Sequence, residues 1–218
     1  MHQLIKFGVN LGRLNLIIDP LTHENFYSIL TGVVVPRPIA FVSSISNSGI
    51  RNLAPFSFFN AVCSVPPTVI VSIKRHTEDK PKDTLSNIEE TGDFVINTVV
   101  DSISTSMNIT SADYPTPVDE FEIAHLTPLH SHIVRAPRVK ESPVNLECQM
   151  KQIIPIGAGL EQYGLVIAEV VLAHVQDRII SGNSINQSKL TAVGRLAGSM
   201  YTHTHEVFSM DRPIYDNV

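Results

Sequence analysis

Three adjacent residues at the start of a predicted helix have side chains suited to binding a phosphate. Lys82, Asp83 and Thr84 open the amphipathic stretch 83–92. The free N–H groups and positive dipole end of such a helix attract an anion, while Lys82 offers a counter-charge and Thr84 a donor. The Asp83 carboxylate would repel a phosphate, so we assign it the structural role of capping the helix. The alternative for Lys82 is an ordinary solvated surface charge.

A second candidate segment, residues 52–59, combines polar and aromatic side chains around Pro55. Because proline has no N–H to donate, this segment can be only an edge strand or an irregular loop. Its unpaired amide and carbonyl groups could then face the polar edge of a ligand, with phenylalanines supplying apolar contact. The alternative is a core strand that ends in aromatic residues. The candidate binding residues of the segment are Asn52, Ala54, Pro55, Phe56, Ser57 and Phe58.

Polar side chains also end the predicted strand 39–46. Ser43 and Ser44 lie beside a turn at residues 47–49, where their hydroxyls could donate to ligand oxygens. Arg37 could add positive charge to the same place. The alternative is that both serines are simply exposed strand residues.

Two His-x-His pairs, His130 with His132 and His203 with His205, each place two imidazoles on one side of an extended chain. This is half of a metal site, but no carboxylate or cysteine completes either pair at a recognised spacing. We therefore expect no bound metal, and we expect replacement of His130 or His203 to leave activity nearly intact. The chain also lacks the GxSxG, HExxH and P-loop motifs.

The composition of the 218-residue chain is that of one globular domain, with 43% hydrophobic residues and a net charge of −5. Its 16 lysines and arginines are scattered, so nucleic acid and membrane surfaces are not expected as partners. No signal peptide or spanning segment is apparent, which favours a cytoplasmic protein. Cys63 and Cys148 have no CxxC spacing and are expected to be small buried residues.

The elements that must position these candidates are mainly β-strands. Strands are expected at 39–46, 68–74, 94–100, 144–154 and 163–175, and the last two should pair antiparallel across the Gly-rich turn 157–159. Short helices are expected at 22–32, with Thr22 as N-cap, at 83–92 and at 119–126. The proline-rich stretch 102–143 is interpreted as an excursion on the outside of the barrel that these strands are expected to form. No GxGxxG follows a strand, which disfavours a Rossmann fold.

A series of motifs, in one order along the chain, resembles the flavin reductase-like, FMN-binding family. The likeness covers roughly residues 20–212 and is far more specific than a single short motif. The matching runs are GVVVPRPIAFVSS at 32–44, NLAPFSFF at 52–59, KDT at 82–84, GDFVIN at 92–97, DEF at 119–121, SPV at 142–144, LEC at 146–148, GRLAG at 194–198, and Tyr201. One departure is His125, where the family usually has a small residue, most often glycine.

The resemblance implies an antiparallel FMN-binding split β-barrel with a few short peripheral helices. Residues 21–212 would form this domain and residues 1–20 an N-terminal extension. It also implies reduction of FMN by NADH or NADPH, with electrons passed to a partner monooxygenase or another acceptor. Arg195 and Tyr201 are carried over as groups that close the flavin end. A non-enzymatic FMN carrier, store or electron-transfer protein is the alternative, and a third is an oxidase-like split barrel that acts on a different phosphate-bearing substrate.

A homodimer is expected from the strand 163–175. Val166, Ala168 and Val170 alternate with Leu165, Ile167 and Val171, so both faces of this strand are apolar. The outer face needs a cover that the few helices cannot fully supply, and a two-fold dimer is the commonest solution. The resemblance adds that related split barrels pair in this way, with flavin near the subunit boundary.

Overall fold

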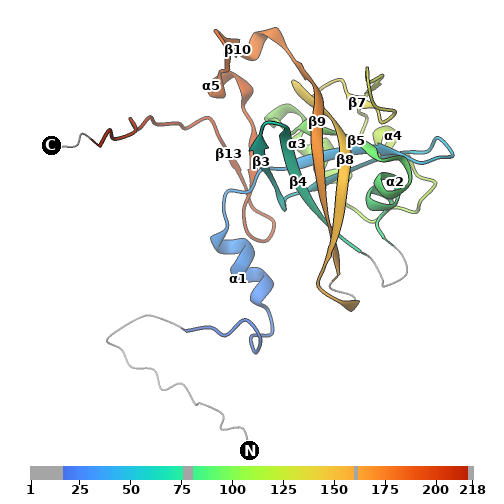
Figure 1. Cartoon of the computed structure of the whole chain (residues 1–218), viewed down its shortest axis with the longest axis horizontal. Helices are drawn as coiled ribbons and strands as arrows, with labels where there is room; N and C mark the ends of the chain where they lie inside the picture. Colours follow the sequence, from blue (N-terminus) through green and yellow to red (C-terminus); the bar gives the residue numbers. More distant parts are fainter. Residues whose placement is uncertain (1–16, 76–80, 160–161, 216–218) are drawn as a thin grey trace, which may run out of the picture.

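The computed structural model describes residues 17–75, 81–159 and 162–215 (Figure 1). Residues 1–16, most of the expected N-terminal extension, lie outside the described residues. One curled antiparallel sheet dominates the fold. Its strands are β1 (Ala40–Ile45), β2 (Arg51–Phe56), β3 (Phe59–Ser64), β4 (Pro67–Lys74), β5 (Asp93–Thr98), β8 (Val144–Ile156) and β9 (Tyr163–Val175).

The remaining elements are short and peripheral, and they include three two-stranded ribbons. The helices are α1 (Phe26–Val33), α2 (Asp83–Thr91), α3 (Ser104–Ile109), α4 (Glu120–Ile123) and α5 (Gln187–Leu190), with 3-10 turns η1 (Asp101–Ile103) and η3 (Asp177–Ile179). The short strands are β6 (Pro128–Leu129), β7 (Arg138–Val139), β10 (Ile180–Ser181), β11 (Ser184–Ile185), β12 (Val193–Arg195) and β13 (Tyr201–His203). No helix in the described ranges is long and apolar enough to cross a membrane.

The sheet closes on itself because of its strand order, β2-β1-β5-β8-β9-β4-β3. Its two edge strands, β2 and β3, are consecutive in the chain and are separated only by Ser57 and Phe58. The sheet must therefore curl until its edges approach each other, which leaves a split beside β2. This arrangement confirms the predicted mainly β, antiparallel barrel with few short helices.

The interior is divided by β1, which is buried on both faces. Ala40 and Val42 face one hydrophobic cluster, which includes residues of β4, β9 and α2. Ile39 and Phe41 face a second cluster, which includes residues of β2, η1, α3 and α4. The alternation along the strand produces both contacts, because successive side chains point to opposite faces of a sheet.

Several boundaries differ from the sequence-based prediction. The helix expected from Thr22 begins at Phe26, because Asn25 rather than Thr22 accepts the capping hydrogen bond, from the N–H of Ser28. Helix α2 has Lys82 at its N-cap position and no side-chain cap, so Asp83 does not cap it. Cys63 is exposed, contrary to expectation, because it lies on the edge strand β3, whereas Cys148 is buried as expected.

The position of His125, where the family usually has glycine, requires an unusual backbone conformation. His125 has φ +54° directly after α4, in the left-handed region that glycine adopts without steric cost. Its side chain is exposed, so the strain lies in the backbone rather than in packing.

Candidate functional site

Two adjoining cavities form a groove beside the split of the barrel, which we call the β2 groove. The larger has a volume of about 340 Å³ and the smaller about 60 Å³. Both are lined by Pro55, Phe56 and Ser111. The larger cavity ends at the β12–β13 ribbon, and the smaller ends at the start of α2.

The free edge of β2 provides one wall of the groove. The N–H of Leu53 points away from β1, because it donates to Oε2 of Glu120 at 3.0 Å. Pro55, two residues further on, shares this outward orientation, since backbone groups alternate along a strand. The proline therefore removes no hydrogen bond from the β1–β2 ladder, which is why β2 tolerates it. The expected edge strand is present, and its outward backbone carbonyls face the split.

A buried polar cluster stands behind the smaller cavity. Asn52 Nδ2 donates to Oε1 of Glu120 at 3.0 Å, and the hydroxyl of Thr84 donates to Oδ1 of Asn52 at 2.6 Å. Burial raises the pKa of Glu120, and the hydrogen bonds from Leu53 and Asn52 partly offset this effect. The cluster fixes the start of α2 against the edge of β2.

The start of α2 has the features of an anion site. The N-cap residue of this nine-residue helix is Lys82, whose side chain accepts no hydrogen bond from the first-turn N–H groups. Lys82 Nζ lies 3.1 Å from Oδ1 of Asp113, and Asp83 accepts a hydrogen bond from the Thr116 hydroxyl. The Asp83 carboxylate is held by Thr116, whereas Asp113 is paired with Lys82 itself, so a phosphate at the cavity wall would have to compete with Asp113 for this cation.

The opposite end of the groove carries two arginines with different roles. The Arg195 guanidinium lies 4.4 Å from the ring centroid of Tyr201, and both residues line the larger cavity. Arg37 is buried, and its guanidinium donates to the backbone carbonyls of Thr31, Val34 and Leu196. Arg37 thus braces α1 against the β12–β13 ribbon, although it also lines the cavity.

The structure brings most of the sequence-predicted site residues to the groove. The lining residues among them are Arg37, Asn52, Ala54, Pro55, Phe56, Ser57, Lys82, Asp83, Thr84, Arg195 and Tyr201. Three others lie elsewhere. Ser43 and Ser44 are fully buried, with Ser43 donating to Pro137 O and Ser44 to Asn52 Oδ1. Phe58 packs between Tyr27 and Tyr163, with ring centroids 6.3 and 6.2 Å away.

Sequence reasoning missed the wall that α3 and the following loop provide. Met107, Asn108 and Ser111 line the larger cavity, and the side chains from Thr110 to Tyr114 line the smaller one. This part of the stretch 102–143, expected as an excursion on the outside of the barrel, therefore also forms a wall of the groove. Its polar, short helix offers no amphipathic period. The link across the groove becomes visible only in the structure, where Tyr201 Oη donates to Asn108 Oδ1 and Met107 packs in the same cluster as Tyr201.

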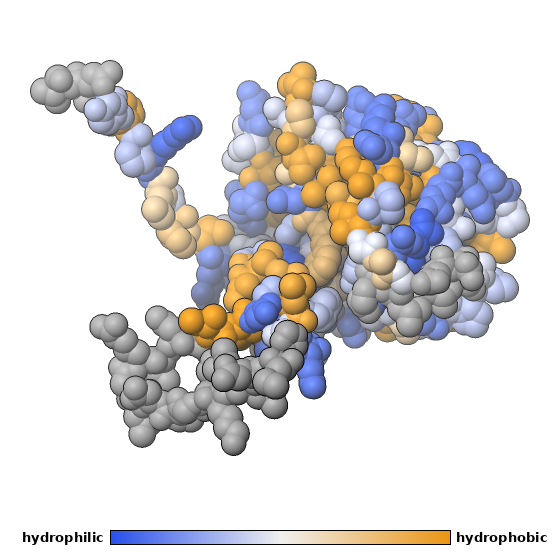
Figure 2. Space-filling view, turned by 60° about the horizontal axis from the view of Figure 1, so that its bottom comes forward, coloured by the Kyte–Doolittle hydropathy of each residue, from blue (hydrophilic) through white to orange (hydrophobic). Residues whose placement is uncertain are grey.

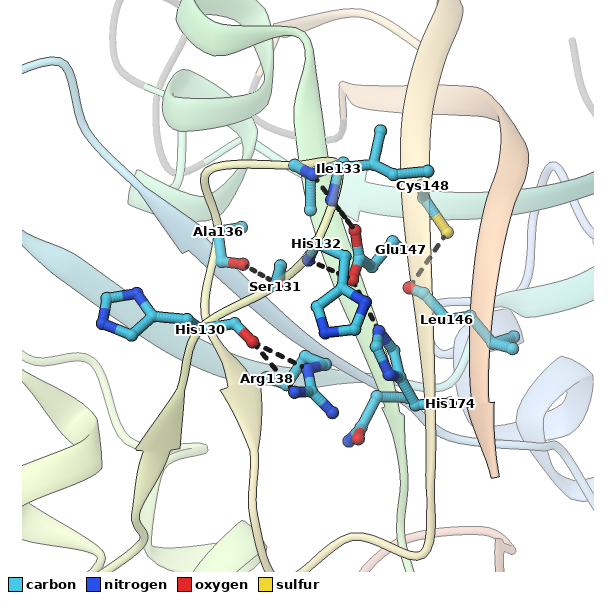
Figure 3. A network of polar contacts seen from close by, with 12 residues as sticks. His130, Ser131, His132, Ile133, Ala136, Arg138, Leu146, Glu147, Cys148 and His174 are labelled. Carbon is cyan, nitrogen blue, oxygen red and sulfur yellow. Dashed lines mark hydrogen bonds and ion pairs between the residues drawn. The ribbon is translucent and has the colours of Figure 1, made fainter. Parts of the chain in front are cut away.

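The first His-x-His pair lies in a polar network around Glu147 and His174 (Figure 3), and none of the residues labelled there lines the β2 groove. Glu147 is completely buried and accepts hydrogen bonds from the backbone N–H groups of His132, Ile133 and Val134. Its carboxylate also lies 2.6 Å from Nε2 of His174. Burial alone would raise the pKa of Glu147, but these four contacts together lower it to about 2. The network fixes the loop over β8 and β9.

The second His-x-His pair does have a third potential ligand, contrary to the sequence analysis. Asp101 Oδ1 lies 2.7 Å from Nδ1 of His203. The potential ligand atoms of Asp101, His203 and His205 all lie within 4.8 Å of one another. Spacing in the sequence does not reveal this third ligand, because the carboxylate lies 102 residues away along the chain and only the fold brings it beside the histidine.

Comparisons with known proteins identify the family of the chain. The sequence model described as "Flavin reductase like domain" matches residues 32–187. An uncharacterized protein of Aquifex aeolicus is 38% identical over 189 residues, which span 86% of this chain and 94% of that protein. An uncharacterized protein of Halalkalibacterium halodurans is 39% identical over 197 residues, spanning 89% and 94% of the two chains.

Solved structures share the fold over nearly the whole chain. Nitrilotriacetate monooxygenase component B from Bacillus cereus superposes with a TM-score of 0.87 at 35% identity, covering 91% of this chain and 100% of that one. Pseudomonas fluorescens 2-nitrobenzoate 2-nitroreductase gives a TM-score of 0.83 at 28% identity, covering 93% and 99%. A split barrel domain structure from Shewanella frigidimarina gives 0.76 at 23% identity, covering 90% and 96%.

Proposed function

The chain belongs to the flavin reductase-like domain family, and on this premise we propose that it is an FMN-binding oxidoreductase that uses NADH or NADPH as reductant. The single observation that carries the proposal is the β2 groove, in which a free backbone edge, an uncapped helix start and an arginine–tyrosine pair line one continuous wall. These are the partners that a flavin's pyrimidine edge, phosphate and ring system require.

The groove residues fit FMN piece by piece. The first-turn N–H groups of α2, with Lys82, would hold the phosphate. The outward carbonyl groups along β2 and the ring of Phe56 would hold the flat ring system. Arg195 and Tyr201 would close the far end. Bound FMN would supply the redox chemistry itself, by accepting a hydride from a nicotinamide and passing electrons on.

The chain's own work in this proposal is binding and orientation. The polar cluster of Asn52, Thr84 and Glu120 fixes α2 against β2, so the phosphate and ring subsites keep a constant separation. Arg37 holds α1 near the opening, where Tyr27 and Thr31 line the larger cavity. No catalytic acid or base is assigned, because hydride transfer to a flavin requires none from the protein.

The electron acceptor is proposed from the more similar solved structures. The relative named as a monooxygenase component supports transfer to a partner monooxygenase. The relative named as a nitroreductase supports a second candidate, direct reduction of a small nitroaromatic compound. Adding either a monooxygenase partner or 2-nitrobenzoate to the reduced protein distinguishes the two.

We also propose that the protein is a homodimer, with α1 at the subunit boundary. Hydrophobic side chains gather over this protruding segment (Figure 2). Tyr27 is 61% and Val33 is 71% exposed, and among α1 residues only Thr31 is buried. A second subunit is the proposed cover, because α1 borders the groove and large exposed apolar areas usually mark an interface. The outward face of β9 is already half-buried and needs less cover than expected.

The test is FMN titration followed by anaerobic mixing with NADH and, separately, NADPH. We expect binding with micromolar or better affinity and loss of the flavin's visible absorbance with at least one nicotinamide. Binding without reduction by either would instead support an FMN carrier or store. A titration that shows neither a fluorescence change nor calorimetric heat would refute the flavin site.

A further inference from the structure

We propose that Asp101, His203 and His205 form a binding site for a divalent transition-metal ion of the Zn²⁺ type. Asp101 lies in η1, His203 is the last residue of β13, and His205 follows two residues later, so the ligands come from segments that are far apart in the sequence. Each is exposed and offers one ligand atom, with no separation between these atoms above 4.8 Å. The site is distinct from the β2 groove and does not depend on the proposed function.

Backbone hydrogen bonds hold both segments that carry the potential ligands, η1 with Asp101 and the β13 segment with the two histidines, against residues 191–193. On one side, Asp101 N–H donates to Thr191 O, and Val193 N–H donates to Val99 O. On the other side, β12 pairs with β13, where Val193 lies opposite His203. The carboxylate and the imidazoles are thus positioned by two sets of backbone hydrogen bonds to residues 191–193, rather than by mobile side chains alone.

The two histidines are held on one side of the chain by the residue between them. Thr204 donates both its N–H and its hydroxyl to Ala192 O, at 3.1 and 2.9 Å. Its neighbours on either side therefore project away from this anchor, as expected for residues two apart in an extended chain. The ring centroids of His203 and His205 accordingly lie only 5.2 Å apart.

The spacing of the ligand atoms requires only a small adjustment to take up an ion. Tetrahedral zinc with bonds of about 2.0–2.2 Å separates its ligand atoms by roughly 3.4 Å. The 2.7 Å contact between Asp101 and His203 would widen, and the longest separation would shorten. Since all three side chains are exposed, these movements disturb no packed core. Two imidazoles and one carboxylate favour Zn²⁺ and similar ions over Mg²⁺ or Ca²⁺, and they leave a position for water.

Metal binding would join the segment after β13 to η1 and α3. Tyr201 lies on the same face of β13 as His203, and Met107 and Asn108 of α3 line a cavity of about 260 Å³ together with both. The same three residues, Tyr201, Met107 and Asn108, also line the larger cavity of the β2 groove. The ion would therefore stabilise the wall of the groove from outside.

The test uses chelator-treated full-length protein, with Zn²⁺ alone as the titrant in calorimetry. We expect one equivalent to bind, and we expect Asp101→Asn and His205→Ala each to weaken binding at least about tenfold. His130→Ala is the matched control, because it removes an exposed imidazole from the other His-x-His pair and should leave the affinity unchanged. Thermal melts of the metal-free variants verify that all of them fold.

Co²⁺ provides a second readout that an ordinary Asp–His ion pair would not give. We expect a visible ligand-field band in the parent protein and its loss in His205→Ala, which leaves the contact between Asp101 and His203 in place. The proposal is overturned if Zn²⁺ binds Asp101→Asn and His205→Ala as tightly as the parent, or if no stoichiometric binding is observed.

Discussion

Glu147 carries a buried charge that is stabilised by donors rather than by an opposing ion alone. Three consecutive backbone N–H groups and His174 surround its carboxylate. A neutral amide at this position would offer one acceptor oxygen and would turn its NH₂ group towards other donors. The loop that begins at His132 would then lose most of what holds it to the barrel.

We therefore expect Glu147→Gln to lower the free energy of unfolding by about 3 kcal/mol, since buried donors lose a charged acceptor. Denaturant unfolding at neutral pH measures the loss. Glu141→Gln is a suitable control, because this carboxylate accepts only an exposed hydrogen bond from Thr127 N–H. Equal stability of Glu147→Gln and the parent would contradict the role assigned to the network.

The same carboxylate gives the fold a defined acid sensitivity. The pKa of Glu147 is lowered in the folded state from its ordinary 4.5 to about 2, so the unfolded chain takes up this proton at higher pH. Its contribution to stability is complete above pH 4.5 and is lost as the pH falls towards 2. We expect the stability difference between the parent and Glu147→Gln to shrink across this window when unfolding is measured at successive pH values.

His125 offers a stabilising substitution. Its φ of +54° costs an L-residue steric energy that glycine avoids. His125→Gly should raise the free energy of unfolding by up to about 1 kcal/mol, reduced by the greater freedom of glycine in the unfolded chain. The matched control is His130→Gly, at an exposed site without positive φ. Destabilisation by His125→Gly would show that the imidazole makes a contact worth more than the backbone strain.

At the scale of elements, the phosphate of FMN has two alternative positions in the groove, the N-terminus of α2 and the β12–β13 ribbon. We expect Lys82→Ala to weaken FMN by about 10- to 100-fold and riboflavin much less, because one charge-assisted bond contributes ~1.5–3 kcal/mol. Arg195→Ala should affect both ligands equally, since this arginine packs on Tyr201. Calorimetric titration of both variants with both ligands checks the assignment, and the reverse pattern would place the phosphate at Arg195.

The elements that could be predicted from sequence are those whose signals are local. The pair β8 and β9 follows from two long apolar runs around a glycine-rich turn, and the end of α2 follows from Gly92 at φ +75°. The burial of Ser43 and Ser44 does not follow from the sequence, because it depends on partners on other elements, Asn97 and Asn87. The α3 wall of the groove and Asp101 beside His203 also depend on distant chain segments.

At the scale of the whole molecule, assembly should depend on α1. Light scattering across a dilution series should give twice the 24.0 kDa chain mass for the parent and the chain mass for Val33→Asp. The charge would have to be buried at the proposed boundary, which is costly without a partner. Ile180→Asp, at an exposed apolar residue on β10, is the control and should remain dimeric. A monomeric parent that binds FMN at full affinity would show that the groove is complete without a second chain.

Pro55 has a further consequence for the behaviour of the protein in concentrated solution. A free sheet edge beside an open groove is a template on which a strand of another molecule can add, and this is a common route to aggregation. On β2 the outward N–H of Leu53 is already bonded to Glu120, and the next outward position has no N–H at all. An incoming strand would therefore find no free donor at either position and would meet the proline ring. The edge can remain open to a small ligand while it is protected from fibre-like strand addition.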